Sequence, residues 1–251
     1  MHILLGAKKT QQIDINCDLG EGTSNESELM PYIQSCNIAC GGHAGDESTM
    51  KEVVKLAVKH QVKIGAHPSY PDRENFGRKS ISISAEKLIS SIQEQIQLMD
   101  GVLGGFSAKL HHIKPHGALY NDIAKDEKRA AVFLQAIRNY KEKVALYVPY
   151  NSVIAKKAKG EGFSIIYEAF ADRSYNPDLS LVARSKPNAV LTDVDAILKQ
   201  VLSVAKEGRV TAVDGSTVPI KADTFCVHSD TENATDIVKY LYNQLHITTL
   251  G

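Results

Sequence analysis

The chain has 251 residues, 43% of them hydrophobic, and its 29 lysine and arginine residues balance its 29 aspartate and glutamate residues. A net charge of zero without any basic run argues against nucleic acid and an anionic membrane surface as partners. The length suits one large core and no low-complexity linker interrupts it, so we expect a single domain over residues 1–251.

The cysteines and the N-terminus bear on where the protein works. Four cysteines without a Cys-x-x-Cys pair are typical of a reducing cytoplasm, with free and mostly buried thiols. The apolar patch within residues 1–12 is too short for a signal-peptide core or a membrane span. We therefore expect a cytoplasmic protein in which residues 1–12 form a flexible extension.

Short apolar runs alternate with longer amphipathic stretches along the chain. The runs predict seven strands, at residues 13–16, 36–39, 62–66, 111–114, 144–148, 164–168 and 224–228. Helical spacing predicts helices at 46–60 and 84–103 and a last helix carrying Ile237, Tyr240, Leu241 and Leu245. Alternation of strands and helices predicts parallel pairing, because parallel strands need long crossovers. A distorted (β/α) TIM-like barrel of about seven strands is expected, with a doubly wound open sheet as the alternative.

The chemically rich residues favour the barrel, because they follow the carboxyl ends of the predicted strands, where (β/α) barrels build their active sites. In chain order they are Asp18, Glu21, His43, Asp46, His67, Lys114, His116, Asp172, Arg173 and Asp230. An open sheet would not gather loops from so many strands at one place.

The first two motifs carry acids, an amide and a histidine. In residues 13–22, Asn16 and Asp18 share a strand face, which predicts polar groups inside a barrel; a solvated edge strand is the alternative. In residues 40–46, His43 is a candidate metal ligand and Asp46 a candidate general base. The alternative for this second motif is a glycine-rich turn in which Asp46 only caps a helix.

The third and fourth motifs add cations. His67 leaves a strand directly, and Arg73 and Arg78 are candidates for binding carboxylate or phosphate, unless they pair with Asp72 and Glu74 at the surface. His112, Lys114 and His116 share one face if residues 111–116 are extended. A lysine at a strand end inside a barrel is rarely structural, so Lys114 is a candidate for charge stabilisation and His116 for proton transfer.

The fifth motif, residues 168–175, adds Asp172 and Arg173, followed by Arg184, and its alternative interpretation is a cluster of surface salt bridges. The sixth, residues 226–230, is weak by itself. The chain has no phosphate-binding P-loop sequence, dinucleotide fingerprint, Gly-x-Ser-x-Gly elbow or His-Glu-x-x-His.

Together and in this order, the motifs resemble the LamB/YcsF family. They stand here as DINCDLGE from Asp14, NIACGGHAGD from Asn37, IGAHPSYPDRENFGR from Ile64, KPHGALYN from Lys114, EAFADRSY from Glu168 and VHSD from Val227. Gly42 and Ser229 depart from the family pattern, as does the N-terminal extension. The resemblance implies a barrel of the glycoside hydrolase/deacetylase type. It also implies ATP-dependent hydrolysis of 5-oxo-L-proline to L-glutamate, together with two other subunits, B and C.

Within that implied reaction we assign hypothetical roles. Lys114, Arg73 and Arg173 would stabilise phosphate charge, with Asn16 and Arg78 also in the binding set. Asp18 or Asp46 would be the general base, and Arg184 would bind the substrate carboxylate. His43 and His67 would hold a divalent metal, which fold analogy suggests. Two other functions stay open: a metal-dependent amidohydrolase or deacetylase that needs no ATP, and a non-catalytic protein that binds substrate for its partners.

Overall fold

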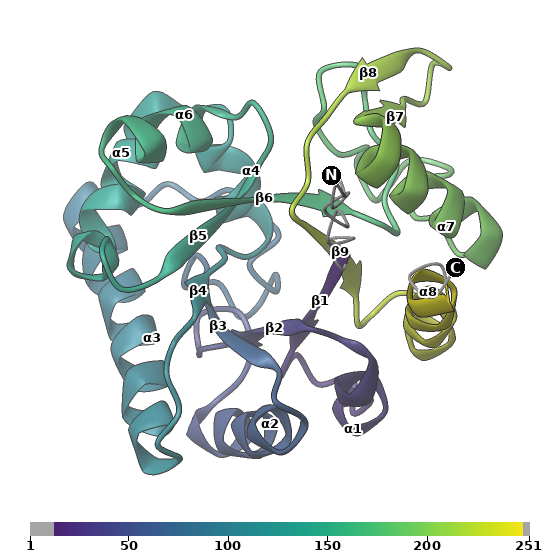
Figure 1. Cartoon of the computed structure of the whole chain (residues 1–251). Coiled ribbons are helices and arrows are strands. Elements are labelled where there is room, and N and C mark those ends of the chain that lie inside the picture. The colour runs from purple at the N-terminus through teal and green to yellow at the C-terminus, as the bar shows by residue number, and fades with distance from the viewer. Residues whose placement is uncertain (1–12, 248–251) are drawn as a thin grey trace, which may run out of the picture.

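Seven parallel strands close into a barrel, as the sequence predicts. The structure, a computed structural model, describes residues 13–247; the predicted extension at 1–12 lies outside the described residues. The barrel order is β1-β2-β3-β4-β5-β6-β9, and β9 pairs with both β6 and β1 (Figure 1). The strands are β1 (Asp14–Leu19), β2 (Ser35–Ala39), β3 (Lys63–His67), β4 (His112–Ile113), β5 (Ala145–Pro149), β6 (Ile165–Phe170) and β9 (Thr224–His228). This closure rules out the open doubly wound sheet.

Helices surround the barrel, so each strand lies between the barrel interior and a helical layer (Figure 1). They are α1 (Glu26–Leu29), α2 (Glu47–His60), α3 (Ala85–Gly105), α4 (Gly117–Ile123), α5 (Glu127–Ala136), α6 (Val153–Gly160), α7 (Val194–Leu202) and α8 (Ala234–Ile247). Three short turns complete them: η1 (Met30–Tyr32), η2 (Arg138–Tyr140) and η3 (Ser203–Glu207). Among residues 13–247, no helix combines the length and the hydropathy needed to cross a membrane.

The strand periodicity explains why polar groups lie inside this barrel. On β1, Ile15, Cys17 and Leu19 belong to the hydrophobic core, whereas Asn16 and Asp18 alternate with them and are also buried. Neighbouring strands contribute further polar side chains at the same level of the barrel, since the buried Asn37 on β2 and the partly buried His228 on β9 are both in register with Asp18. The barrel interior is therefore polar, and the apolar core lies between the strands and the helices.

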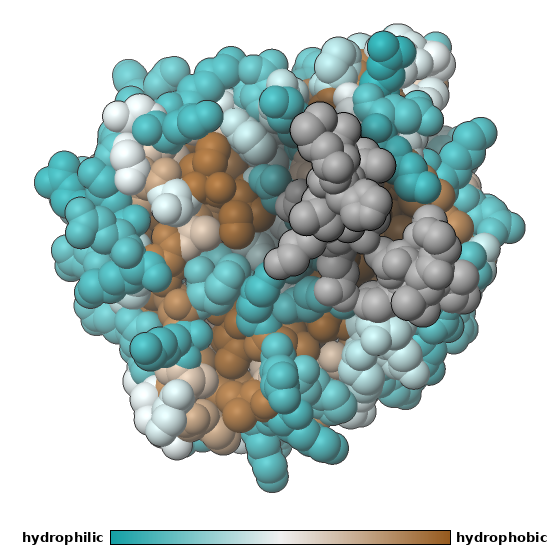
Figure 2. All heavy atoms as spheres, viewed as in Figure 1, coloured by the Kyte–Doolittle hydropathy of each residue, from teal (hydrophilic) through white to brown (hydrophobic). Residues whose placement is uncertain are grey.

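The helices keep polar side chains on their outer surfaces. On the face shown in Figure 2, the rim is mostly hydrophilic and hydrophobic residues appear nearer the middle. All four cysteines are free and buried, as the sequence predicts. Burial stabilises the fold through apolar area removed from water and needs no disulfide in a core of this size.

The segment between β6 and β9 departs from the simple alternation of strand and helix. It contains α7 and a two-stranded antiparallel hairpin of β7 (Arg209–Thr211) and β8 (Thr217–Pro219), which stand outside the barrel (Figure 1). Its first part, which carries Arg173 and Arg184, follows the carboxyl end of β6. The excursion thus supplies one wall of the barrel mouth.

Candidate active site

A pocket of about 640 Å³ opens at the carboxyl ends of the barrel strands. Its lining combines acids, histidines and cations from at least four strand ends with aromatic side chains. The polar residues at its inner end are Asp18, Glu21, His67, Lys114, His116, Glu168 and His228. Loops distant in sequence therefore converge on one polar mouth, as the position of the motifs predicts.

Lys114 lies at the centre of this polar mouth. Its side chain is buried, and its Nζ lies 2.8 Å from Asp18 Oδ1 and 2.8 Å from Glu168 Oε1. Burial opposes the charged ammonium, but Asp18 and other acidic neighbours, including Glu168, hold the pKa of Lys114 well above its usual value. Lys114 is thus a buried ammonium shared by two carboxylates, one on β1 and one on β6.

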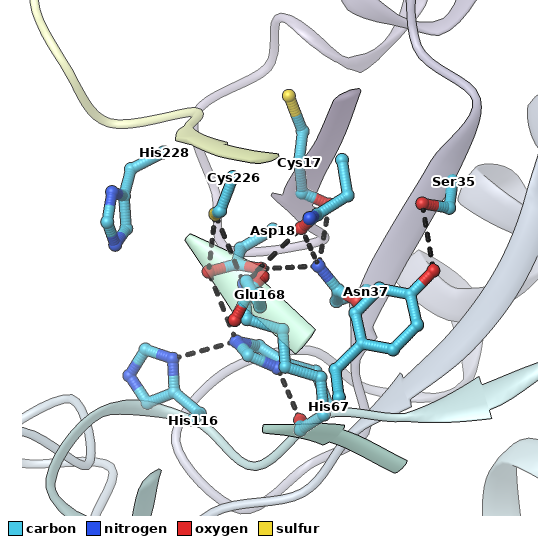
Figure 3. Close-up of polar contacts among 12 residues, drawn as sticks. Cys17, Asp18, Ser35, Asn37, His67, His116, Glu168, Cys226 and His228 are labelled. Carbon is cyan, nitrogen blue, oxygen red and sulfur yellow. Dashed lines mark hydrogen bonds and ion pairs between the residues drawn. The ribbon is translucent and has the colours of Figure 1, made fainter. Parts of the chain in front are cut away.

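Asp18 is held as an anion despite its burial. Asn37 donates to Asp18 Oδ1 at 2.7 Å, and His67 Nε2 lies 3.4 Å from Asp18 Oδ2 (Figure 3). Burial would raise the pKa of Asp18, but the charges of His67 and Lys114 outweigh it and hold that pKa well below the usual range. A carboxylate in this state can accept a proton from a bound molecule.

The polar groups beneath Asp18 fix its position. Asn37 also donates to Asn16 Oδ1 at 2.7 Å and lies 2.7 Å from His112 Nε2 through its own Oδ1. Asn16 in turn donates to Thr224 Oγ1 at 2.9 Å. Asn16, predicted to bind substrate or phosphate, is therefore buried below the pocket and contacts Asp18's partners rather than the open space.

On the other side of Asp18, three histidines surround the carboxylate of Glu21. Glu21 Oε1 lies 2.8 Å from His43 Nε2, 3.2 Å from His116 Nδ1 and 3.7 Å from His67 Nε2. The rings of His43 and His116 are stacked, with centroids 3.6 Å apart. We call these four residues the histidine cluster. One donor atom from each lies within 4.8 Å of the others.

Backbone carbonyls orient two rings of the histidine cluster. His67 Nδ1 lies 2.7 Å from the carbonyl oxygen of Lys114, and His116 Nε2 lies 2.9 Å from that of Phe76. A carbonyl accepts only, so these nitrogens must carry protons, and neutral rings then turn the lone pairs of His67 Nε2 and His116 Nδ1 inward. These two inward nitrogens are 3.0 Å apart. Two lone pairs at that distance repel each other unless a proton or a cation lies between them. Burial opposes a charge on His67, but Asp18 raises the pKa of His67, so without a cation this ring holds the proton.

The remaining features of the histidine cluster also fit a divalent cation. Burial lowers the pKa of His43 to about 3, which keeps the ring in the neutral form that binds metals. Its Nε2 faces Glu21 at 2.8 Å, and its Nδ1 has no hydrogen-bond partner within residues 13–247, so no acceptor behind this ring fixes its tautomer. Three imidazoles and a carboxylate, with carbonyls behind two of the rings, are a donor set typical of zinc and other first-row metals.

Of the predicted residues, the structure brings together Asp18, His43, His67, Lys114 and His116. His116, expected to transfer protons, lies among the candidate metal ligands. Glu21 completes that group, although the sequence singled it out only as a charged residue after the first strand. Its neighbours along the chain are glycines, so nothing local indicates that it faces His43.

The four predicted arginines separate into two groups. Arg78, Arg173 and Arg184 line the pocket, and Arg78 and Arg184 both pair with Asp230. Arg173 donates to the carbonyl oxygens of Ala189 and Val182, so it also anchors the excursion after β6.

Arg73 lies elsewhere. It donates to the carbonyl oxygens of Gly41 and Gly45, at 3.2 and 2.9 Å, and does not line the pocket. It therefore ties the loop after β3 to the loop after β2. The expectation that it binds a ligand in the pocket is not supported by this position.

Asp46 also lies outside the pocket. It is exposed and forms the N-cap of α2, where its Oδ1 accepts from the backbone N–H of Thr49 at 2.8 Å and from the Thr49 hydroxyl at 3.0 Å. These hydrogen bonds lower the pKa of its carboxyl. The helix-cap interpretation is confirmed, because the carboxylate accepts from a free helix N–H group. This position outside the pocket does not support the suggestion of Asp46 as general base.

Two further acids, Asp172 and Glu168, acquire defined partners only in the fold. Asp172 is buried and accepts from His228, through the backbone N–H and with Nδ1 3.0 Å away, and from the Thr231 hydroxyl. Burial would raise the pKa of Asp172, but His228 and these hydrogen bonds lower it. Glu168 was noted as part of a motif without a role, and it is the second partner of Lys114.

The family model of the LamB/YcsF family matches residues 13–250 of the chain. A protein of Haemophilus influenzae (strain PittEE), named as the A subunit of 5-oxoprolinase, is 41% identical over 235 residues, covering 94% of this chain and 96% of that protein. A Staphylococcus aureus (strain bovine RF122 / ET3-1) protein of the same name is 43% identical over 228 residues, covering 89% and 91%.

Solved structures agree on the fold. The lactam utilization protein of Thermus thermophilus superposes with a TM-score of 0.87 at 33% identity, covering 94% of this chain and 97% of that one. A GH18 chitinase of Pseudoalteromonas aurantia, at 10% identity and a TM-score of 0.53 over 92% and 99%, shares the fold alone. With its motifs, its barrel and these relatives in agreement, the chain belongs to the LamB/YcsF family.

Proposed function

We propose that this chain opens the ring of 5-oxo-L-proline to give L-glutamate, as the A subunit of a cytoplasmic, ATP-dependent 5-oxoprolinase with subunits B and C. The names of its relatives support the reaction and a multi-subunit enzyme. A lactam is a stabilised amide that resists water, so coupling to ATP has a chemical reason: phosphorylation of the carbonyl oxygen would create a leaving group.

The observation that carries the proposal is the buried ammonium of Lys114 between two carboxylates at the inner end of the pocket. A cation fixed in a water-poor site stabilises negative charge that develops on a carbonyl or phosphoryl oxygen, and it needs no reorganisation during the reaction. Lys114 is assigned that role.

Asp18 is assigned as the general base. It is ionised, buried and lines the pocket, and its hydrogen bonds to Asn37 hold it in one orientation. In the ring opening, Asp18 would take a proton from the attacking water as the C–O bond forms and return it to the ring nitrogen as the C–N bond breaks. The acyl phosphate left by this step would then be hydrolysed by a second water to L-glutamate and phosphate.

Cations at the rim are suited to the substrate's own carboxylate. Arg184 and Arg78 line the pocket and share Asp230 as their ion-pair partner, and an incoming carboxylate would replace or extend that pairing. Arg173, buried in the same wall, adds positive charge behind them.

The histidine cluster would hold a divalent metal through His43 Nε2, His67 Nε2, His116 Nδ1 and Glu21. When bound, such an ion supplies Lewis-acid polarisation of an oxygen or a more acidic water. Asp18 stands 3.4 Å from His67 Nε2, so the base and the cluster adjoin the same part of the pocket.

The histidine cluster also favours one alternative: a metal-dependent amidohydrolase that works without ATP. The two functions separate in one assay, in which glutamate release from 5-oxo-L-proline is followed with the chain alone and with its partner subunits, each with and without ATP. The proposal expects release only with ATP and partners. Release by the chain alone without ATP would replace it with the alternative.

A further inference from the structure

Two buried polar groups in the pocket wall, Glu168 and Tyr120, have no role toward a ligand in the assignments above, where Glu168 serves only as a partner of Lys114. Glu168, on β6, is 2% exposed, and neither of its carboxylate oxygens has a hydrogen-bond partner within residues 13–247; its ionic contact is with Lys114. Tyr120, on α4, is 5% exposed, and its hydroxyl likewise lacks a partner of good geometry. Both residues line the pocket.

The two groups are neighbours. Burial, then the charge of Glu168 and a side-chain contact with it, raises the pKa of the Tyr120 hydroxyl well above its usual value, so the phenol keeps its proton; that contact is not a well-aligned hydrogen bond. The pair therefore presents a carboxylate, which only accepts, beside a hydroxyl, which can donate. A buried polar group without a partner is costly, so this arrangement suits a ligand that supplies both missing partners.

The surroundings limit the shape of that ligand. The Tyr120 ring packs edge-to-face on Phe170, with centroids 5.7 Å apart, and Phe170 stacks on His228 at 5.2 Å. Lys114 Nζ lies 5.3 Å from the centre of the Phe170 ring. Aromatic walls around a few fixed polar groups are typical of a site for a small, compact molecule.

We propose that Glu168 and Tyr120 are specificity-determining residues that bind the amide edge of a cyclic amide. A small ring holds its amide in the cis form, so the N–H and the C=O leave the molecule on the same side. The N–H would donate to Glu168 while Tyr120 donates to the C=O. An open-chain amide is almost always trans, with these groups pointing in opposite directions, and cannot satisfy both residues at once.

This inference rests on the proposed function for the identity of the ring and adds how the site selects it. The carboxylate of Glu168 also stays near Lys114, so recognition of the amide edge sets the carbonyl beside the ammonium. Recognition of the amide N–H and stabilisation of charge on its carbonyl would then both depend on Glu168, which contacts the ligand and Lys114.

The test compares 5-oxo-L-proline with its lactone counterpart, in which a ring oxygen replaces the N–H. Binding of both to the full chain is measured by calorimetry, and turnover of 5-oxo-L-proline is measured in the reconstituted complex. The wild type is expected to bind the lactam at least ~10-fold more tightly, because sites built for an N–H reject analogues that lack it.

Two variants separate the two contacts. In Glu168→Gln, Lys114 would hold the remaining amide oxygen and turn the NH2 toward the ligand's N–H, so lactam affinity falls about 10- to 100-fold while lactone affinity changes little. In Tyr120→Phe, both affinities fall about 10-fold, because the ligand's C=O loses its donor in the lactam and in the lactone alike. Tyr140→Phe, which removes a hydroxyl bonded to Asp100 outside the pocket, is the control and leaves both affinities unchanged.

The outcomes are distinguishable. If the complex turns over 5-oxo-L-proline but Glu168→Gln keeps the wild-type ratio of lactam to lactone affinity, the inference is overturned and the proposed function stands. If the ratio depends on Glu168 but no turnover occurs, the proposed function fails and the inference stands. If the wild type binds neither compound, the inference is overturned as well.

Discussion

The two sides of Lys114 differ in how completely the protein satisfies its own polar groups. On the Asp18 side, Asn37 and the histidine cluster surround the carboxylates with hydrogen bonds at 2.7 to 3.4 Å. On the Glu168 side, the carboxylate has its ion pair with Lys114 at 2.8 Å, but neither it nor the neighbouring hydroxyl of Tyr120 forms a well-aligned hydrogen bond in the described part of the chain. One side is preorganised by the protein and suits a fixed ion and a base, whereas the other is completed by a ligand.

The largest expected effect comes from removing the cation that both sides share. Lys114→Met leaves two buried carboxylates without their counter-charge, so we expect a loss of about 3–5 kcal/mol in the free energy of unfolding and loss of measurable turnover. Chemical denaturation and the reconstituted assay measure the two effects.

A second change tests whether the loss arises from the acids. Adding Glu168→Gln to Lys114→Met removes one unpaired charge, so stability should partly return while turnover does not. If Lys114→Met were as stable as the wild type, the ammonium would not be needed to keep the carboxylates of Asp18 and Glu168 buried side by side. That result would contradict the description of Lys114 as their shared counter-charge.

Next in size is the effect of emptying the histidine cluster. Treatment with a chelator should lower the melting temperature and reduce turnover in the complex about 100-fold or more, with recovery on adding zinc or another divalent metal. His43→Ala should copy the treatment and lower the metal content measured by elemental analysis. His111→Ala is the matched control, since His111 lies outside the cluster and its variant should keep the metal.

A smaller effect is expected at the rim of the ligand side. Arg184→Ala should raise KM for 5-oxo-L-proline about 10-fold with little change in kcat, because a contact to the non-reacting carboxylate contributes equally to ground state and transition state. Steady-state kinetics decide it. Arg73→Ala, which loses contacts only to loop carbonyls, should leave KM near the wild-type value; an equal effect of both would place the substrate elsewhere.

The same two sides differ in how far the sequence could predict them. The seven strands lie within three residues of their predicted bounds, because each is an apolar run with a distinctive polar residue at its end. The cluster of His43, His67 and His116 follows from those strand ends, since closing a parallel barrel brings them together. Short helices and the β7–β8 hairpin carry weak periodicity and were not predicted.

The ligand side depends on contacts that no local pattern encodes. Tyr120 and Glu168 are 48 positions apart by their numbers, on a helix and a strand with apolar neighbours, and their lack of partners is visible only in the fold. The position of Arg73 depends on the carbonyls of two glycines in another loop. Chemistry-bearing residue types can be listed from sequence, but which of them face open space cannot.

Substitutions of Asp46 should give the smallest effect. They also test directly whether a candidate residue chosen from sequence faces the pocket. Asn is as good an N-cap as Asp, so Asp46→Asn should change neither stability nor turnover. Asp46→Ala should lower the free energy of unfolding measurably with turnover unchanged, because the cap is lost. Asp193→Ala, which removes the corresponding cap of α7, should cost a similar amount and serves as the control.

Turnover decides between a cap and a base at this position. A general base in direct contact with the reacting water loses orders of magnitude in rate when Asn replaces it, because the amide cannot take the proton. Asp18→Asn should show that loss and Asp46→Asn should not. If the two variants lost activity equally, the N-cap of α2 would take part in the reaction although it does not line the pocket. Asp18 would then not be the only base, and the Asp18 side of Lys114 would not be the preorganised side.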